Sequence, residues 1–304
     1  MTSLPFSTPR PEPSVVQAPA AGTGDPLRAL LANVVDYAGL FPPAALDMPS
    51  AVRAYRRYRT GDHAWMLGAF VAPASRLEEL GAAVAEQGER APWPVSVIVS
   101  SPDDGARLAT HAHLDVRALE IAPRDAAPLR APVADRDIDV FFEVPLDAAM
   151  DHRLDAVARA GAAAKVRTGG VRKDAFPSAE LLARFVAGCA ERGVAFKATA
   201  GLHHPVRGRY PLTYEPAAAT CEMFGFLELA LVAALLRARR VGTEEAAVLL
   251  QGGPGVEIDG DALLWAGHHV SGDEITELRR SLFRSFGSCS FEEPVADLAG
   301  MGLL

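Results

Sequence analysis

The sequence predicts an α/β fold, a (β/α)8 TIM barrel with a long helical insertion between its seventh and eighth strands. Short apolar runs alternate with segments of helical periodicity along most of the 304 residues. These runs are almost continuously apolar, which is typical of parallel strands that helices cover on their outer face. An eighth apolar run near the C-terminus, followed by one last helical segment, completes the number of βα units that closes such a barrel.

The expected elements follow one another in a regular order. The strands are apolar stretches rich in Val, Ile, Ala or Phe, at 34–37, 64–73, 95–100, 116–123, 137–145, 162–168, 195–201 and 284–290. The helices have apolar residues at helical spacing, at 26–34, 50–61, 75–88, 103–112, 146–161, 178–193 and 291–302. Ser75 is the expected N-cap of the third helix, because a serine hydroxyl accepts a hydrogen bond from the first turn.

Residues 203–283 are too many for one βα connection, so we interpret them as an elaboration over the active-site face of the barrel. We expect a polar loop at 203–216 and a hairpin at 256–267. We expect helices at 219–239, 243–250 and 272–283. Residues 1–25 are rich in proline and small side chains, which predicts a disordered leader. Residues 26–304 are then a single barrel domain.

Composition narrows the class of partner. The formal net charge of −8 argues against a nucleic-acid partner and against an anionic membrane surface. No apolar run is long enough to span a bilayer, and the apolar helix around 224–236 leaves two roles open, core or the surface of a homodimer. The three cysteines are widely spaced and form no CxxC pair, so we expect a reducing compartment, the cytoplasm.

Lysine is rare and unusually placed in this chain. Lys165, Lys173 and Lys197 are the only lysines, and the other 27 of the 30 basic residues are arginines. Lys165 and Lys197 each lie within an apolar strand, on two consecutive strands. Their ammonium groups could simply reach solvent at the strand ends, but a desolvated lysine can lose its proton and act as an amine nucleophile, whereas arginine cannot.

Two neighbouring lysines in an apolar wall favour Schiff-base chemistry. Burial and the repulsion between two cations both lower the pKa of an amine. A free amine attacks a carbonyl to form a Schiff base, which acts as an electron sink for breaking or forming a carbon–carbon bond. Glu120 and Glu143, at the ends of neighbouring strands, could move protons for this reaction.

Four short motifs in this order resemble the deoxyribose-phosphate aldolase family, the class I aldolases on a TIM barrel. The motifs are KVRTG (165–169) on the sixth strand, FKATAG (196–201) on the seventh, FGSCS (286–290) on the eighth and DYAGL (36–40) at the start. The resemblance covers about residues 33–202 and 284–301. It implies that Lys165 is the Schiff-base nucleophile, that Lys197 lowers its pKa, that Glu120 stands in the place of the catalytic aspartate and that Glu143 is a polar strand ending.

The resemblance also implies a metal-independent lyase that needs no cofactor and acts on a small aldehyde or ketone. Whether that substrate is phosphorylated or otherwise anionic is left open, because Ala200 and Cys289 replace residues of the family's phosphate site. The polar and glycine residues at the predicted strand ends are the expected substrate contacts: Asp36, Arg167, Thr168, Gly169, Thr199, Gly201, His203, His204, Gly287, Ser288 and Ser290.

Several alternatives remain at this point. Asp36 could instead cap a loop, and His203 with His204 could ligate a metal, although adjacent residues on a strand point in opposite directions. The chain could also be an isomerase or hydrolase in which His203, Glu120 and Glu143 carry out acid–base work. A third possibility is a catalytically silent barrel that binds a metabolite or a protein.

Overall fold

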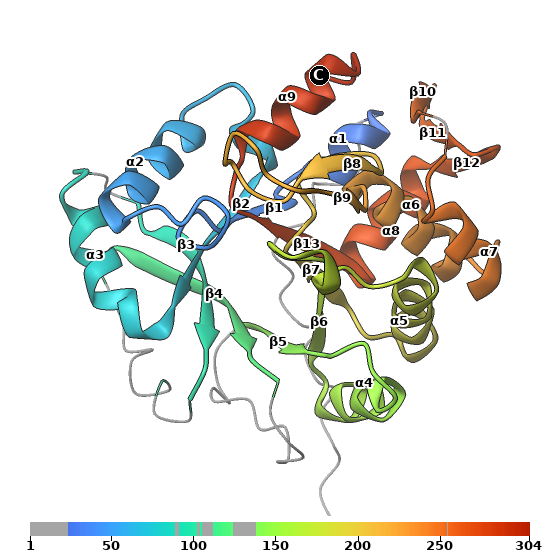
Figure 1. The fold of residues 1–304 in the computed structure, drawn as a ribbon, viewed down its shortest axis with the longest axis horizontal. Helices are drawn as coiled ribbons and strands as arrows, with labels where there is room; N and C mark the ends of the chain where they lie inside the picture. The colour runs from blue at the N-terminus through green and yellow to red at the C-terminus, as the bar shows by residue number, and fades with distance from the viewer. Residues whose placement is uncertain (1–23, 89–90, 102–103, 105–111, 124–137, 254) are drawn as a thin grey trace, which may run out of the picture.

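The computed structural model describes residues 24–88, 91–101, 104, 112–123, 138–253 and 255–304. Within these residues, eight parallel strands close into a barrel, and their order around the ring follows the order of the chain (Figure 1). The strands are β1 (Val35–Tyr37), β2 (Leu67–Pro73), β3 (Trp93–Val99), β4 (Leu114–Ile121), β5 (Asp139–Glu143), β6 (Ala163–Arg167), β7 (Phe196–Thr199) and β13 (Phe283–Ser288). The predicted TIM barrel is confirmed.

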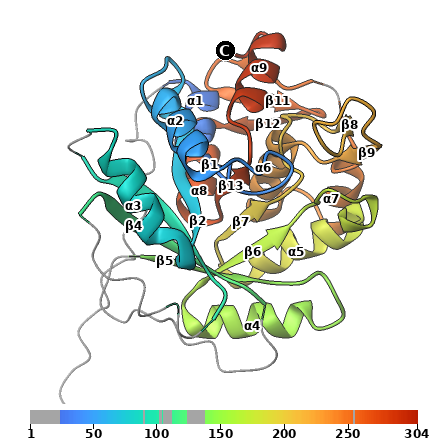
Figure 2. The same cartoon turned by 60° about the vertical axis from the view of Figure 1, so that its left-hand side comes forward.

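Helices lie around the outside of the barrel, as Figures 1 and 2 show from two directions. They are α1 (Pro26–Leu31), α2 (Met48–Arg59), α3 (Leu77–Ala85), α4 (Met150–Ala160), α5 (Ala179–Arg192), α6 (Phe226–Arg237), α7 (Thr243–Leu249), α8 (Gly272–Ser281) and α9 (Glu292–Gly300). Side-chain caps and glycines fix the ends of several of these helices. For example, the Ser178 side chain accepts a hydrogen bond from Leu181 N at the start of α5, and Gly193 closes its end at φ 62°.

The chain between β7 and β13 holds α6, α7, α8 and two small antiparallel sheets. One sheet pairs β8 (Gly208–Pro211) with β9 (Thr220–Met223). The other contains β10 (Glu257–Asp259), β11 (Ala262–Trp265) and β12 (His268–Ser271). The hairpin expected at 256–267 is therefore present and carries a third strand.

Three local predictions are wrong. The polar loop expected at 203–216 contains strand β8, because Gly208–Pro211 pairs with Thr220–Met223. The helix expected from residue 219 begins only at Phe226, because Thr220–Met223 pairs as a strand. Ser75 does not cap α3; it lies in a short 3-10 turn, and Arg76 precedes the helix without a side-chain cap. The helix expected at 103–112 and nearly all of the expected leader lie outside the described residues.

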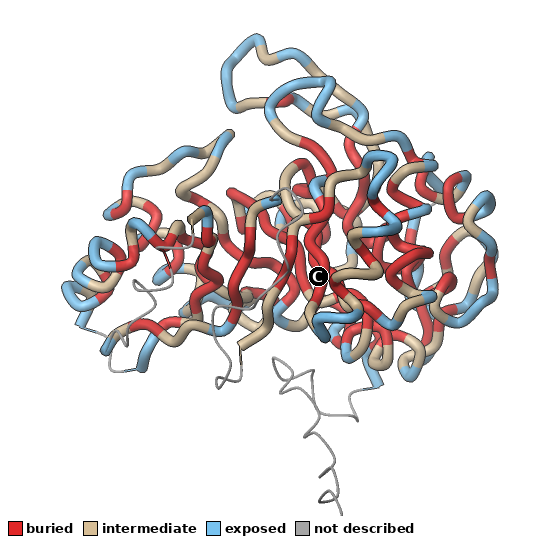
Figure 3. Tube along the Cα trace, turned by 90° about the horizontal axis from the view of Figure 1, so that it is seen from below, coloured by how far each residue is buried: buried red, intermediate tan, exposed pale blue. Residues whose placement is uncertain are grey.

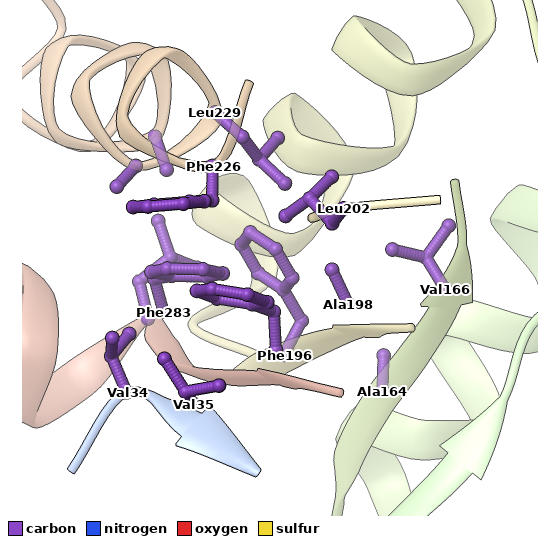
Figure 4. Packing of buried hydrophobic residues seen from close by; sticks show 14 of the residues in the cluster. Val34, Val35, Ala164, Val166, Phe196, Ala198, Leu202, Phe226, Leu229 and Phe283 are labelled. Atoms are coloured by element: carbon purple, nitrogen blue, oxygen red, sulfur yellow. The ribbon is translucent and has the colours of Figure 1, made fainter. Parts of the chain in front are cut away.

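Strand alternation sorts the side chains of β6 and β7 into two sets. Ala164, Val166, Phe196 and Ala198 are fully buried in the large core between barrel and helices, where the Phe196 ring lies 5.4 Å from the ring of Phe283 (Figure 4). Side chains alternate along a strand, so Lys165 and Lys197 face the barrel interior instead. The tube in Figure 3 shows that the barrel strands are mostly buried.

The barrel interior has its own small apolar layer. Ala118, Phe141 and Ala163 form a buried cluster separate from the large core. Each precedes a charged residue by two positions, Glu120, Glu143 and Lys165 respectively, so the charged groups lie on the same inner face one step nearer the C-terminal strand ends. In the described part of the chain, no helix combines the length and the apolar composition needed to cross a bilayer.

Candidate active site

The strand register places both lysines and one glutamate side by side. Glu143 of β5 is the register partner of Lys165 on β6, and Lys165 is the partner of Lys197 on β7. Parallel strands lie about 4.8 Å apart, and register partners point to the same face. The two lysines that the sequence predicts to be neighbours are therefore on one level of the barrel interior, together with Glu143.

Lys197 is held by two buried carboxylates. Its Nζ lies 2.6 Å from Asp36 Oδ2 and 2.6 Å from Glu120 Oε1, and 5.4 Å from the centre of the Phe141 ring. The side chain is only 1% exposed. Asp36 is thus an ion-pair partner within β1, and the interpretation of this residue as a loop cap is wrong.

The Asp36 carboxylate is itself held by neighbouring strands. Its Oδ2 accepts a hydrogen bond from Ser285 Oγ at 2.7 Å, and its Oδ1 accepts one from Ala69 N at 2.9 Å. A Cβ atom on Gly68 would lie 2.4 Å from Asp36 Oδ1, so a side chain at this position of β2 would displace the carboxylate. These contacts aim Asp36 at Lys197.

Glu120 joins the two lysines. Its Oε1 is bonded to Lys197, its Oε2 lies 3.1 Å from Lys165 Nζ, and Ser96 Oγ donates to Oε1 at 2.7 Å. Burial alone would raise the pKa of Glu120, but Lys197 and Lys165 outweigh burial and lower the pKa to about 2. Glu120 is therefore a carboxylate at neutral pH, and each of its oxygens pairs with one of the two lysines.

Lys165 lies nearer to solvent through its second partner. Its Nζ is 2.8 Å from Glu143 Oε2, and Glu143 Oε1 accepts a hydrogen bond from Arg167 Nε at 2.9 Å. The exposed fraction of the side chain rises along this path, from 3% at Lys165 to 11% at Glu143 and 59% at Arg167. Three carboxylates and three cations make the cluster formally neutral.

The expected lowering of the Lys197 pKa is wrong in direction. Burial does favour the neutral amine, but the carboxylates of Asp36 and Glu120 outweigh burial, and the pKa of Lys197 is raised. Lys197 is thus a permanent ammonium group. The sequence interpretation considered the two cations and the apolar wall, and it did not foresee that Asp36 and Glu120 both reach the same nitrogen.

The polar and glycine residues after β6 and β7 shape the turns there. Thr168 is fully buried, and its Oγ1 donates to the carbonyl of Ala200 at 2.6 Å. Gly201 has φ 71°, and a Cβ on Gly169 or Gly201 would collide with the Phe176 ring. Thr199 Oγ1 lies against Gly287, where a Cβ would be 3.1 Å away. These residues hold the mouth of the barrel in shape.

His203 and His204 both face α9. His203 Nδ1 lies 2.7 Å from Glu293 Oε2, and His204 Nδ1 lies 2.6 Å from Asp297 Oδ2, one helical turn further on. The expectation that the two rings point in opposite directions is wrong, because they lie after the end of β7 and not within a strand. Among the described residues, His203 bonds to Glu293 and lies near Ser288, and no hydrogen bond links it to Glu120 or Glu143.

The end of β13 completes this side of the mouth. Ser288 is fully buried; its Oγ donates to the carbonyl of Ser290 at 2.6 Å and lies 3.4 Å from His203 Nδ1. Ser290 Oγ accepts a hydrogen bond from Glu293 N at 3.2 Å. Both serines thus stabilise the turn into α9.

In the described residues, no three His, Cys, Asp or Glu side chains are arranged to hold a metal ion.

Several contributors escaped the sequence interpretation, among them Ser96, Ser285, Tyr214, Glu293 and Asp297. Ser96 is the single polar residue of the apolar strand β3, which is a signal that sequence inspection could have used, whereas Ser285 follows Arg284 in β13 and does not stand out. Tyr214 donates to Glu293 at 2.9 Å, and these two residues are distant in the chain, with no local pattern that connects them.

Neither the protein-family models nor the curated proteins contain a match to this chain. The function is therefore inferred from the geometry of the lysine–carboxylate cluster.

Proposed function

We propose that this protein is a class I aldolase-type carbon–carbon lyase, in which Lys165 forms a Schiff base with a small aldehyde or ketone. One observation carries the proposal. The Nζ of a lysine that is 3% exposed lies between two carboxylates, Glu120 and Glu143, one strand away from a second buried lysine.

The surroundings favour Lys165 over Lys197 as the nucleophile. Lys197 has its shortest contacts, 2.6 Å each, to Asp36 and Glu120, and its raised pKa keeps the proton on nitrogen. Lys165 has longer contacts, 3.1 and 2.8 Å, and one of its partners leads toward solvent. An amine must lose a proton before it attacks a carbonyl, so the lysine with a route for that proton is the better nucleophile.

The proton can leave and return through Glu143. The Lys165 ammonium gives one proton to the Glu143 carboxylate, and the free amine attacks the carbonyl carbon to form a carbinolamine. That proton then returns to the carbinolamine oxygen, which departs as water and leaves an iminium ion. The Glu143 carboxylate then takes the proton of the substrate's β-hydroxyl group, and the bond between the α and β carbons breaks. The β carbon leaves in a carbonyl product, and the electron pair of the broken bond passes toward the iminium nitrogen, which leaves an enamine. Return of the proton from Glu143 to the enamine carbon and hydrolysis of the resulting iminium by water release the second product and restore Lys165.

Lys197 and Glu120 support this step electrostatically. The permanent Lys197 ammonium offsets one of the two negative charges of Asp36 and Glu120, so that Lys165 can become neutral without leaving all three carboxylates uncompensated. The resemblance to the deoxyribose-phosphate aldolase family supports the same choice of nucleophile, because the family's Schiff-base lysine corresponds to Lys165. The three cysteines are free, which supports a reducing compartment such as the cytoplasm.

Trapping with borohydride tests the proposal. Reduction in the presence of glyceraldehyde, acetaldehyde or dihydroxyacetone should convert the iminium to a stable secondary amine, and peptide mass analysis should place the adduct on Lys165. The Lys165→Arg variant keeps the cation but cannot form an imine at this position, so adduct formation should fall by about 1000-fold or more.

Lys173 provides a matched control, because it is the one other lysine and is exposed. A Lys173→Arg variant should keep the adduct yield of the unmodified chain. An adduct found equally on Lys173 and Lys165 would indicate ordinary surface reactivity, and no adduct on Lys165 with any of the three carbonyl compounds would refute the proposal.

A further inference from the structure

A hollow lies at the C-terminal end of the barrel strands, beside the turns that follow β6 and β7. It is a small cavity of about 70 Å³. Its wall includes the backbone of Gly170 and Gly201 and the side chains of His203, His204, Tyr214 and Glu293. We call this cavity the histidine pocket.

The position of the histidine pocket is where many TIM-barrel enzymes bind phosphate. In such enzymes the loops after the seventh and eighth strands and the start of a following helix often form the phosphate site. Here the pocket has residues that follow β7, and it has Glu293 from the first turn of α9, the helix that follows β13.

The charges in the histidine pocket are unsuited to a phosphate. None of the described residues that line it is a lysine or an arginine. Glu293 is a carboxylate, because hydrogen bonding to His203 outweighs burial and lowers its pKa. A second carboxylate, Asp297, lies behind His204. A phosphate dianion placed here would be close to Glu293 and would lack a fixed cation.

The hydrogen-bonding groups suit a hydroxyl instead. An ionised carboxylate can only accept, so Glu293 and Asp297 each require a proton on the Nδ1 atom of their histidine. The Nε2 atoms of His203 and His204 then remain, and no hydrogen bond to a described residue occupies them. A hydroxyl group both donates and accepts, so it can bond to Nε2 whether the imidazole is neutral or charged.

We propose that the histidine pocket receives an uncharged, hydroxyl-bearing end of the carbonyl substrate and rejects a phosphate ester. This inference rests on the proposed function, because it places the far end of the molecule that reacts with Lys165. The substrate class is therefore a small non-phosphorylated hydroxyaldehyde or hydroxyketone.

A pair of aldehydes that differ only in the phosphate tests the inference. Glyceraldehyde and glyceraldehyde 3-phosphate present the same carbonyl, so borohydride trapping on Lys165 compares their far ends directly. We expect glyceraldehyde to label Lys165 at least about tenfold faster at equal concentration, a factor that corresponds to about 1.4 kcal/mol.

Two glutamine variants locate the origin of the discrimination. Glu293→Gln removes the negative charge from the pocket and should reduce the preference for glyceraldehyde several-fold. Glu292→Gln removes the same charge from the adjacent residue, which pairs with Arg57 and does not line the pocket, so the preference should not change. Thermal melting of both variants confirms that they are folded.

The outcomes separate the two proposals. Equal or faster labelling by the phosphate ester would overturn the inference and leave the aldolase proposal intact. Labelling by acetaldehyde alone would also overturn it, because the hydroxyl would then contribute nothing. Failure of every carbonyl compound to label Lys165 would refute the proposed function itself.

Discussion

The two buried lysines lie on adjacent strands in the same barrel layer, yet their surroundings differ. Lys197 is enclosed by Asp36 and Glu120, which are 6% and 2% exposed and are held in turn by Ser285 and Ser96. Lys165 shares Glu120, but its other partner, Glu143, leads to the exposed Arg167. Both carboxylates around Lys197 are fixed by hydrogen bonds from buried serines. Of the two carboxylates around Lys165, Glu143 is partly exposed to solvent.

This difference teaches how one barrel layer can give the same side chain two roles. A lysine between two buried carboxylates keeps its proton, since losing it would leave the carboxylates uncompensated in a poorly solvated site. A lysine with one carboxylate near the mouth can exchange a proton with solvent. The following predictions test this division, beginning with the largest expected change in free energy.

Removal of the Lys197 charge should destabilise the fold. In Lys197→Met, Asp36 and Glu120 would remain buried without their shared cation, and loss of one partner from a buried ion pair costs about 3–5 kcal/mol. Urea unfolding should show this loss in the free energy of unfolding. The matched variant Lys173→Met alters an exposed lysine and should change it by less than about 0.5 kcal/mol. Equal stability of the two variants would show that Lys197 is not the electrostatic anchor of the cluster.

Acid should weaken the same cluster through Glu120. Its pKa is lowered from 4.5 to about 2 in the folded state, so the stabilisation it provides is complete above about pH 4.5 and is lost as the pH falls toward 2. A shift of this size corresponds to about 3 kcal/mol.

The pH dependence can be assigned with two variants. Glu120→Gln should remove the part of the slope of unfolding free energy against pH that lies between pH 4.5 and 2. Glu79→Gln alters an exposed glutamate bonded to Arg76 and should leave that slope nearly unchanged, because exposed ion pairs contribute little. A slope that persists in Glu120→Gln would contradict the assignment.

Loss of the Glu143 carboxylate should slow imine formation more than it destabilises the fold. Glu143→Gln preserves the shape of the side chain but cannot accept the proton from Lys165. We expect imine formation to slow by about 100-fold, measured by borohydride quenching at timed intervals, with a smaller loss of stability than in Lys197→Met. An unchanged rate would show that Glu120 or water takes the proton instead.

Much of the architecture could be predicted from the sequence. Continuous apolar runs separated by helical segments predicted all eight strands in their order around the barrel, because burial on both faces of a strand requires that composition. Errors occurred where the local pattern was ambiguous. Thr220–Met223 follows a run of alanines and reads as the start of a helix, yet cross-strand pairing with Gly208–Pro211 makes it a strand.

The residues of the candidate site could be predicted from the sequence, but the ion pairs between them could not. The scarcity of lysine directed attention to Lys165 and Lys197, and the strand ends indicated Glu120, Glu143 and Asp36. No local pattern showed that Asp36, 161 positions before Lys197, would bond to it. For that reason the predicted direction of the Lys197 pKa was wrong. Glu293 was likewise missed as the partner of His203, because 90 positions separate them.

The sequence by itself determined the alternation of strand and helix. It also determined that both lysines point into the barrel, because successive side chains of a strand point to opposite faces and Val166 and Ala198 face the helices. Closure of the barrel decided everything that depends on pairs of charges. Coulomb interactions act through space over a few ångströms, so only the ring that brings β1, β4 and β7 around one interior could make Lys197 a fixed cation and leave Lys165 with a route to solvent.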